Sequence, residues 1–346
     1  MNDLLLSNYD YSLPQELIAH SPVEPKDSAK LLVYNRNDKS ITHTTFASFI
    51  DFLPKDSTLI FNDTKVIKAR IYGNKLHDYC KLGARVEALF HKALSDSIFL
   101  LQFKGRFKVG DIVHFDNGMF AKILKDCGGG FKEASFSKNY NFSYCMDEVE
   151  FLEFLENYGS IPLPPYIKSD SNNKEVEYNS IFARNLGAIA APTASLHFSE
   201  ESFAKLQHNF RCAFVTLHVG AGTYLGVESE NILEHKMHKE RFVIPQQTID
   251  ILKNSKHITA IGTTATRVIE SYYRDGIVSG ECDLFLNPKN KPLKTNSILT
   301  NFHLPKTTLL MLVSSFVGLS ELKRIYKEAI DNRYRFYSYG DGMLVI

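Results

Sequence analysis

The organisation of this chain is set by short alternating runs such as Ala84-Arg85-Val86-Glu87-Ala88-Leu89-Phe90 and Ile98-Phe99-Leu100-Leu101-Gln102-Phe103. A repeat of two residues is typical of a β-strand with one buried face. Runs of this kind continue from about Ala69 to Phe136, with Gly or Asn turns between them and no helical periodicity. Closely spaced short strands predict a small antiparallel β-barrel in this part of the chain.

On both sides of these runs the sequence alternates between strands and helices. Buried strands are predicted at 31–34, 58–61, 212–219 and 257–261, and amphipathic helices at 44–53, 200–209, 246–254 and 321–332. Insertions are tolerated at surface loops whose ends lie close together. We therefore expect an α/β fold, in which a discontinuous α/β sandwich domain of residues 1–68 and 150–346 is interrupted by an inserted β-barrel domain of residues 69–149.

Composition limits the classes of function. The 346 residues carry 40 Lys and Arg against 39 Asp and Glu, so a polyanion would have to be held by a local patch. The five cysteines are scattered without a Cys-x-x-Cys pair, which indicates reduced thiols. No secretory signal is visible, and the longest apolar segment, 309–317, is too short to cross a bilayer. We expect a cytoplasmic protein that is not bound to membranes.

In four stretches of the C-terminal half, an apolar run is interrupted by His, Thr, Asn, Gly or Pro. Polar groups beside a core are costly unless they bind something, so four such breaks at the ends of buried strands indicate one site. The stretches are 190–198 (AAPTASLHF), 216–223 (TLHVGAGT), 261–267 (IGTTATR) and 300–308 (TNFHLPKTT).

Three of these stretches contain a histidine: His197, His218 and His303. A neutral imidazole in such a context can exchange protons near pH 7. A hydrogen-bonded core histidine is the simpler interpretation of each one alone. The occurrence of three histidines in similar contexts favours a role in proton transfer.

Gly262-Thr263-Thr264 lies between a strand and a helix that continues through Arg267. Helix N-terminal amides and Thr hydroxyls suit a carboxylate, a phosphate or a ribose hydroxyl, although a Thr cap without ligand explains the same pattern. Gly220 and Gly222 do not precede a helix, which argues against a methyltransferase loop. We expect them to adopt unusual dihedrals that let the backbone approach a ligand.

The sequence offers no convincing metal site. His235 and His238 share one helical face, but no third ligand follows at a zinc spacing, so we expect no metal.

Basic and aromatic residues occur together in three places. The segment 61–70 places cations along a strand, and 104–108 puts Arg106 and Phe107 at a turn that suits a phosphate and a stacked base, or a solvated hairpin tip. The segment 333–342 is denser in aromatics and charge than a terminal strand needs. We interpret this last segment as functional.

The chain resembles, over nearly its full length, the S-adenosylmethionine:tRNA ribosyltransferase-isomerase family of queuosine biosynthesis. The motifs that carry the resemblance are 9–14 (YDYSLP), 16–19 (ELIA), 61–67 (FNDTKVI), 161–167 (IPLPPYI), 190–194 (AAPTA), 196–198 (LHF), 216–220 (TLHVG), 237–238 (MH), 262–264 (GTT), 300–305 (TNFHLP) and 334–341 (YRFYSYGD). Ser195, Lys68 and Lys289 depart from the family pattern, where a glycine, a proline and a Pro-Gly turn are usual.

The resemblance implies that the ribosyl part of S-adenosylmethionine is transferred to the aminomethyl group of a 7-deazaguanine at the wobble position of a tRNA. Epoxyqueuosine-tRNA forms, and adenine and methionine are released. The sulfonium acidifies the adjacent ribose carbon, so the protein has to supply a base for that carbon, a proton for adenine and a dry pocket. S-adenosylmethionine is then a co-substrate, no cofactor is permanently bound, and we expect a monomer.

With this reaction in view we assign candidate roles. Proton transfer is assigned to His197, His218 and His303 in an undecided order, with Asn301 among the catalytic residues. Asn301, Thr193 and Thr223 would position the ribose, with Gly220 and Gly222 beside the co-substrate. The methionine carboxylate or another anion is assigned to Gly262, Thr263, Thr264 and Arg267, the tRNA phosphates to Lys65, Arg70, Arg106 and Arg335, and base stacking to Tyr337 and Tyr339.

Three other functions compete with this one. A metal-dependent hydrolase would contain stoichiometric metal, and a non-catalytic RNA-binding module would bind with a steep salt dependence but consume no co-substrate. An ordinary methyltransferase is disfavoured by the context of Gly220 and Gly222. The four polar breaks favour an enzyme.

Overall fold

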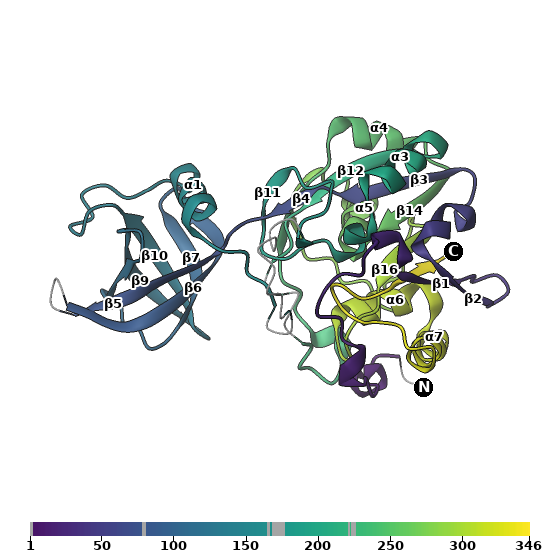
Figure 1. Cartoon of the computed structure of the whole chain (residues 1–346), viewed down its shortest axis with the longest axis horizontal. Helices are drawn as coiled ribbons and strands as arrows, with labels where there is room; N and C mark the ends of the chain where they lie inside the picture. The colour runs from purple at the N-terminus through teal and green to yellow at the C-terminus, as the bar shows by residue number, and fades with distance from the viewer. Residues whose placement is uncertain (1–2, 78–80, 165–166, 168–176, 221, 223–225) are drawn as a thin grey trace. The chain divides into compact units, whose positions relative to one another are not determined.

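The computed structural model describes residues 3–77, 81–164, 167, 177–220, 222 and 226–346. It contains two compact units, Met1–Lys65 with Pro164–Ile346 and Val66–Leu163. The first is an α/β unit and the second contains a closed barrel (Figure 1). The expected fold class is confirmed.

The α/β unit is built on a sheet of nine strands in the described part of the chain. Four neighbours, β12, β3, β14 and β16, run parallel, so their carboxyl ends share one edge of the sheet. In spatial order the strands are β15 (Ser279–Cys282), β13 (Glu240–Val243), β12 (Arg211–Leu217), β3 (Ser57–Asn62), β14 (His257–Ile261), β16 (Ser297–Asn301), β17 (Gly342–Val345), β1 (Lys30–Tyr34) and β2 (Ile41–Thr45).

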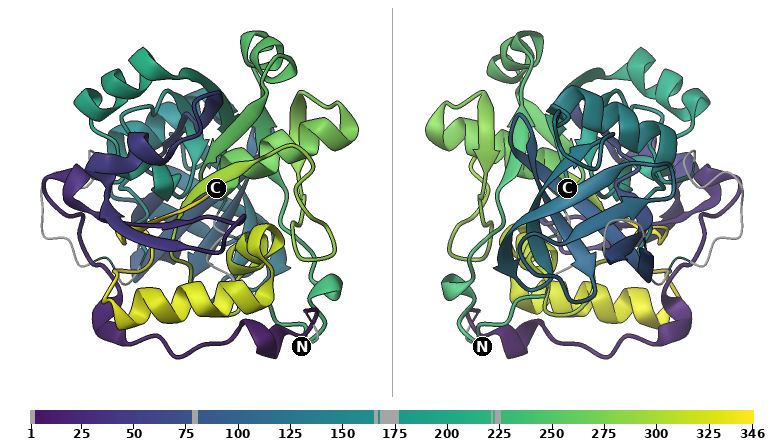
Figure 2. Two further views of the ribbon diagram at one scale, coloured as in Figure 1. Left: turned by 90° about the vertical axis from the view of Figure 1, so that its right-hand side faces the viewer. Right: turned by 90° about the vertical axis from the view of Figure 1, so that its left-hand side faces the viewer.

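Both faces of this sheet are covered, as the alternation in β1 shows. Leu31 and Val33 join a core cluster with Phe46, Phe198 and residues of α3 (Glu200–Asn209). Leu32 and Tyr34 join a second cluster with α6 (Thr308–Val317) and α7 (Leu319–Asp331). The N-terminal segment with η1 (Leu6–Tyr9) lies along α7 (Figure 2). The result is a sandwich of helices around one sheet.

Shorter elements complete the α/β unit. Helices α4 (Gln246–Lys253) and α5 (Thr263–Asp275) pack on β12, and α5 also packs on β14. The remaining elements are η2 (Gln15–Leu17), η3 (Lys26–Ser28), η5 (Thr193–His197), η7 (Ile232–Glu234) and a two-stranded sheet of β4 (Thr64–Val66) and β11 (Asn185–Ala188).

The prediction of an amphipathic helix over 44–53 is wrong. The first residues pair with β1 as part of β2, and residues 46–52 form the 3₁₀ helix η4 (Phe46–Phe52). Phe46 and Phe49 are buried three residues apart, which is the repeat of a 3₁₀ helix. The other predicted strands and helices of the α/β part are confirmed to within two residues.

The second unit contains the expected antiparallel barrel, with the alternation of β7 as its clearest mark. Phe99, Leu101 and Phe103 are buried, and the residues between them are partly exposed. Around the barrel the order is β10 (Phe131–Ser137), β7 (Ile98–Lys104), β6 (Lys81–Ser95), β5 (Arg70–His77), β8 (Ile112–Phe115) and β9 (Phe120–Gly128).

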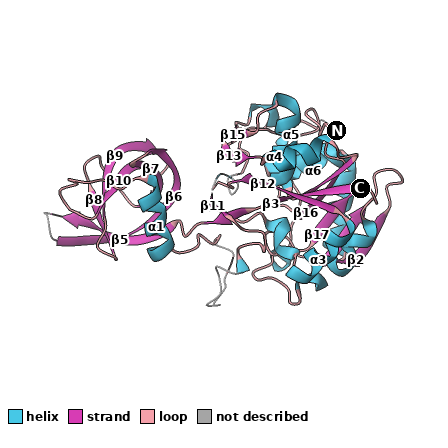
Figure 3. Ribbon diagram, turned by 90° about the horizontal axis from the view of Figure 1, so that it is seen from above, coloured by secondary structure: helices cyan, strands magenta, loops and turns pink. Residues whose placement is uncertain are grey.

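Helix α1 (Glu148–Tyr158) belongs to the barrel unit, whereas most of it was expected in the α/β part. Phe151, Phe154 and Leu155 of this helix are buried in the barrel core, and the Phe151 ring stacks on Phe99 at 4.2 Å. Figure 3 shows α1 beside the strands of the barrel. The compact unit therefore ends at Leu163 instead of 149. Within the described residues no helix has the length and apolar character to cross a membrane.

Phe151→Ala tests the packing of α1. Removing a buried ring leaves a cavity, so we expect a loss of about 3–5 kcal/mol in the free energy of unfolding of the barrel unit. Faster amide exchange in β6, β7 and β10 would report it, and Val149→Ala, 67% exposed on the same helix, is the control. Faster exchange confined to residues 200–346 would contradict the assignment.

Candidate functional site

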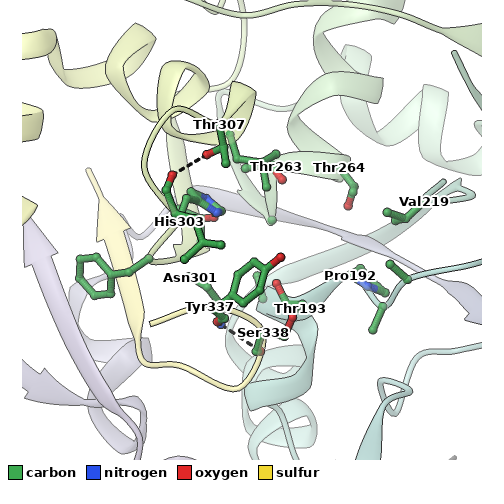
Figure 4. Close-up of a pocket in the computed structure, with 18 of the residues that line it drawn as sticks. Pro192, Thr193, Val219, Thr263, Thr264, Asn301, His303, Thr307, Tyr337 and Ser338 are labelled. Atoms are coloured by element: carbon green, nitrogen blue, oxygen red, sulfur yellow. Dashed lines mark hydrogen bonds between the residues drawn. The ribbon is translucent and has the colours of Figure 1, made fainter. Parts of the chain in front are cut away.

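The four polar breaks predicted from the sequence converge on one cleft within the α/β unit. The cleft leaves about 800 Å³ free of protein atoms, part of which is open to solvent. Figure 4 shows Thr193, Thr263, Asn301 and His303 around it. Its wall comprises residues 178, 190–194, 219, 262–264, 300–304, 307, 309 and 337–338.

The sheet explains this convergence. Val219, Gly262 and Phe302 follow the carboxyl ends of β12, β14 and β16, which belong to the parallel part of the sheet. Ligands of open α/β sheets bind at this edge, because the loops that leave parallel strands all emerge there.

A buried network at the end of β3 fixes the loops of this edge. The amide of Asn62, which is fully buried, donates to the Leu217 carbonyl at 3.0 Å and to Thr264 Oγ1 at 3.1 Å. Its Oδ1 accepts from the amide groups of Leu217 at 3.0 Å and of Thr64 at 3.2 Å. Asp63 Oδ1 accepts from Thr216 Oγ1 at 2.6 Å. Asn62 thus connects β3, β12 and the first turn of α5.

Of the three predicted histidines, His303 lines the cleft. Its side chain is buried, and its Nε2 lies 2.9 Å from Thr300 Oγ1. Its backbone N–H donates to Tyr326 Oη at 3.1 Å, and its carbonyl accepts from Tyr11 Oη. Burial lowers the pKa of His303 to about 3, so the imidazole is neutral at physiological pH.

The other two histidines lie behind the cleft wall. The ring of His197 stacks on Phe46 at 4.0 Å, and burial, with Arg335 nearby, lowers its pKa to about 3. His218 Nδ1 lies 2.8 Å from Thr64 Oγ1, and burial, with a contribution from Arg241, lowers its pKa as well. The assignment of proton transfer to these two imidazoles therefore has no support from the lining of the cleft.

Asn301 holds the loop that forms one side of the cleft. Its Nδ2 donates to the carbonyls of Tyr337 at 3.1 Å and Ser338 at 3.3 Å. Tyr337 has a φ of 78°, which is unfavourable for a residue with a side chain. The Oδ1 of Asn301 is buried and has no hydrogen-bond partner among the described residues. The Asn301 side chain also interacts with the ring of His197 behind the wall.

Thr193, Gly262, Thr263 and Thr264 line the cleft. Gly262 has φ 94° and ψ 159°, a conformation that essentially belongs to glycine, and it starts α5 at the cleft wall. The N-terminal turn of α5 therefore faces the cleft.

Arg267 is not brought to this cleft. It is buried, forms an ion pair with Glu240 and donates to the carbonyls of Leu284 and Cys282 at 3.1 Å each. It lines a separate small cavity with Gly222 and His238. Arg267 shares a helix face with Thr263 and Thr264, but the ion pair with Glu240 holds its guanidinium at this other cavity, so its assignment to an anion in the cleft has no geometric support.

The glycine loop also differs from expectation. Gly220 does not have a positive φ, so the unusual dihedral expected for it is wrong. The Gly220 N–H donates to Glu240 Oε1 at 2.9 Å, and a Cβ at Gly222 would meet the His238 ring. Thr223 lies outside the described residues.

The residues proposed for tRNA lie in different places. Tyr337 lines the cleft, whereas Arg335 and Tyr339 line a second cavity that also contains His197. Lys65 lies in β4 of the α/β unit. In the barrel unit, Arg70 donates to the Leu163 carbonyl at 3.2 Å and Arg106 is exposed.

Sequence reasoning missed several residues that build the site. Thr300, Asn62, Thr64 and Glu240 hold other site residues in place. A signal was present for Asn62 and Thr64, which end an apolar strand with polar side chains. Ser195, a departure from the family pattern, is fully buried, and its Oγ has no partner in the described part of the chain.

The described residues contain no group of three His, Cys, Asp or Glu side chains that could hold a metal ion. Cys127, Cys145, Cys212 and Cys282 are free thiols.

Comparisons with known proteins cover the whole chain. The family described as queuosine biosynthesis protein matches residues 6–345. An S-adenosylmethionine:tRNA ribosyltransferase-isomerase of Campylobacter jejuni subsp. jejuni serotype O:23/36 (strain 81-176) is 50% identical over 99% of both chains. The enzyme of the same name from Helicobacter pylori (strain G27) is 48% identical over 100% of both chains. The crystal structure of S-adenosylmethionine tRNA ribosyltransferase from Thermotoga maritima superposes with a TM-score of 0.55 at 29% identity, covering 98% of this chain and 100% of that one.

Asn62→Ala tests the network behind the cleft. It leaves the N–H and carbonyl of Leu217 without their side-chain partner, so we expect a loss of about 3 kcal/mol in the free energy of unfolding. Urea unfolding at neutral pH measures it. Asn209→Ala, which removes an exposed contact at the end of α3, is the control, and equal stability of the two variants would contradict the role of Asn62.

His303→Gln tests the burial of the neutral imidazole. Below the ordinary pKa of 6.5 the unfolded chain takes up a proton at His303 that the folded chain refuses until about pH 3. Stability from this group is therefore present above about pH 6.5 and falls as the pH drops. The variant should lose stability less steeply than wild type, by up to about 1.4 kcal/mol per pH unit, in urea unfolding between about pH 6.5 and pH 4. Parallel slopes would show that His303 titrates normally.

Proposed function

We propose, from the premise that this chain belongs to the queuosine biosynthesis protein family, that it transfers and isomerises the ribosyl part of S-adenosylmethionine onto the aminomethyl group of 7-aminomethyl-7-deazaguanine at the tRNA wobble position. The products are epoxyqueuosine-tRNA, adenine and methionine. S-adenosylmethionine acts as a co-substrate without a resident cofactor, and the protein works as a cytoplasmic monomer.

One observation carries this proposal: the described residues of the cleft wall present hydroxyl, amide and imidazole groups and no charged side chain. Hydroxyl and amide groups suit the ribose and the nucleobase. The sulfonium loses its positive charge when methionine departs. A buried site without a carboxylate does not stabilise the starting cation, so the loss of charge becomes easier.

His303 is our choice for proton transfer inside the cleft. A neutral imidazole can accept a proton from the acidified ribose carbon or donate one to adenine, depending on its tautomer. Thr300 at 2.9 Å fixes the ring orientation. We assign the ribose to Thr193 and Asn301, and the methionine carboxylate to Thr263 and Thr264 at the start of α5. His197 and His218 support the wall from behind.

Labelled S-adenosylmethionine tests the reaction. Purified protein is incubated with a tRNA carrying the aminomethyl deazaguanine and with co-substrate labelled either in the ribosyl carbons or in the methyl group. We expect ribosyl label in the RNA, methyl label in free methionine, and one adenine for each ribosyl transferred. Chelator should have no effect.

Each competing function gives a different result. Methyl label in the RNA would indicate a methyltransferase, and loss of activity with chelator would indicate a metal-dependent enzyme. Binding of tRNA without release of adenine would indicate a binding module.

His303→Ala tests the proposed base or acid. We expect a fall in kcat of about 10²–10⁴-fold, because positioned proton transfer contributes that much. The dissociation constant for tRNA should stay within about twofold. His208→Ala, which changes an exposed histidine on α3, is the matched control. Unchanged turnover in His303→Ala would remove this residue from the mechanism.

A further inference from the structure

A second, smaller cavity lies beside the cleft in the α/β unit. It leaves about 250 Å³ free of protein atoms, part of which is open to solvent, and is lined by Lys26, His197, Arg335, Ser338 and Tyr339, together with apolar neighbours. The cleft wall has no charged side chain among its described residues, whereas this cavity has two cations. Its chemistry is therefore different from that of the cleft.

Both cations have N–H donors that are not used in short hydrogen bonds. Lys26 is partly exposed and has no ion-pair partner among the described residues. The guanidinium of Arg335 makes two long contacts of 3.4 Å, to Asp341 Oδ1 and to the Ser21 carbonyl. Asp341 already accepts backbone amides from Lys30 at 3.0 Å and from Arg335 at 2.7 Å, and the carboxylate of Glu177 acts on the neighbouring Tyr339. Neither carboxylate is among the described residues that line the cavity, whereas both cations are.

A buried polar atom completes the cavity. The side chain of His197 is held by its stack on Phe46, and its Nε2 has no partner at full hydrogen-bond geometry in the described part of the chain, although the Asn301 side chain interacts with the ring. A buried nitrogen of this kind favours an additional polar partner. A neutral imidazole can donate one N–H to an oxyanion, and lysine and arginine add charge-assisted hydrogen bonds.

The cavity and the cleft share a wall. Ser338 lines both, and Asn301, which lines the cleft, holds the Ser338 carbonyl at 3.3 Å. A group bound in the small cavity is therefore separated from a group bound in the cleft by the loop that contains Ser338. In RNA a base is joined to its own backbone phosphate through one sugar, which suits this arrangement.

We propose that the small cavity is a phosphate pocket, which holds a backbone phosphate of the RNA whose modified base enters the cleft. This inference rests on the proposed function, because it takes the RNA from that reaction. The other anion of the reaction, the carboxylate of S-adenosylmethionine, already has a place at the N-terminal turn of α5. The pocket is bordered by the exposed Ser21, where a long polymer can reach it.

Direct tRNA binding tests the phosphate pocket without catalysis. The dissociation constant of unmodified tRNA is measured between about 50 and 200 mM salt for wild type, Lys26→Gln and Arg335→Gln. Each lost phosphate contact reduces the slope of log K against log salt by about 0.7–0.9, and we expect a weakening of about five- to tenfold at low salt. Lys253→Gln, which removes the same charge from the exposed surface of α4, is the control and should match wild type.

A second measurement distinguishes the two anions considered for the cavity, an RNA phosphate and the carboxylate of S-adenosylmethionine. The affinity of the free protein for S-adenosylmethionine is measured in the same variants and should stay within about twofold. Weaker co-substrate binding with normal tRNA binding would assign the cavity to the carboxylate and overturn the inference, as would an unchanged salt slope in Lys26→Gln. If Arg335→Gln does not fold, the salt slope of Lys26→Gln, which changes a partly exposed position, still tests the phosphate pocket. Failure of wild type to bind tRNA at all would overturn the proposed function together with the pocket.

Discussion

The site depends on the four hydrogen bonds of the buried Asn62 side chain. This one amide is bonded to β12, to the segment after β3 and to Thr264 in the first turn of α5. A buried amide is costly unless all its donors and acceptors are used, and here the described contacts use them. The loops that form the cleft are thus held at fixed positions before any ligand arrives, which is the condition for precise positioning of reacting groups.

The arrangement of the histidines follows from the same constraint. His303 is placed in the cleft by Thr300, whereas His218 is tied to Thr64 and His197 is stacked on Phe46. Burial keeps all three neutral, so the chemistry of the cleft does not depend on a permanent positive charge. Two cations, Lys26 and Arg335, instead line the neighbouring small cavity. This separation suits a reaction that joins a cationic co-substrate to a polyanion.

Much of the fold was predictable because it is encoded locally. The alternation in 98–103 predicted a barrel strand, and the apolar runs 31–34 and 257–261 predicted buried strands of the sheet. The helix predicted at 44–53 failed because pairing with β1 overrode the local pattern in its first residues. The boundary at α1 failed because its apolar face meets partners in the barrel that are distant in sequence.

The site was predictable in part for the same reason. Gly262, Thr263, Thr264, Asn301 and His303 end strands that are parallel neighbours, so a local signal coincided with a common edge of the sheet. Arg267 could not be assigned from the sequence, because its partner Glu240 comes from another strand, β13. The stacking of His197 on Phe46 likewise could not be predicted, because the two residues are distant in the sequence and meet only in the folded structure. Contacts between distant segments decide which polar residue faces a ligand and which supports the wall.

The central claim is that the four polar segments bind S-adenosylmethionine together. Amide hydrogen exchange with and without this co-substrate tests it most directly, because a ligand slows exchange where it restricts local opening. The account predicts slower exchange within 190–198, 216–220, 262–267 and 300–308 together, with residues 66–163 unchanged. Protection confined to the barrel unit, or to one of the four segments, would contradict it.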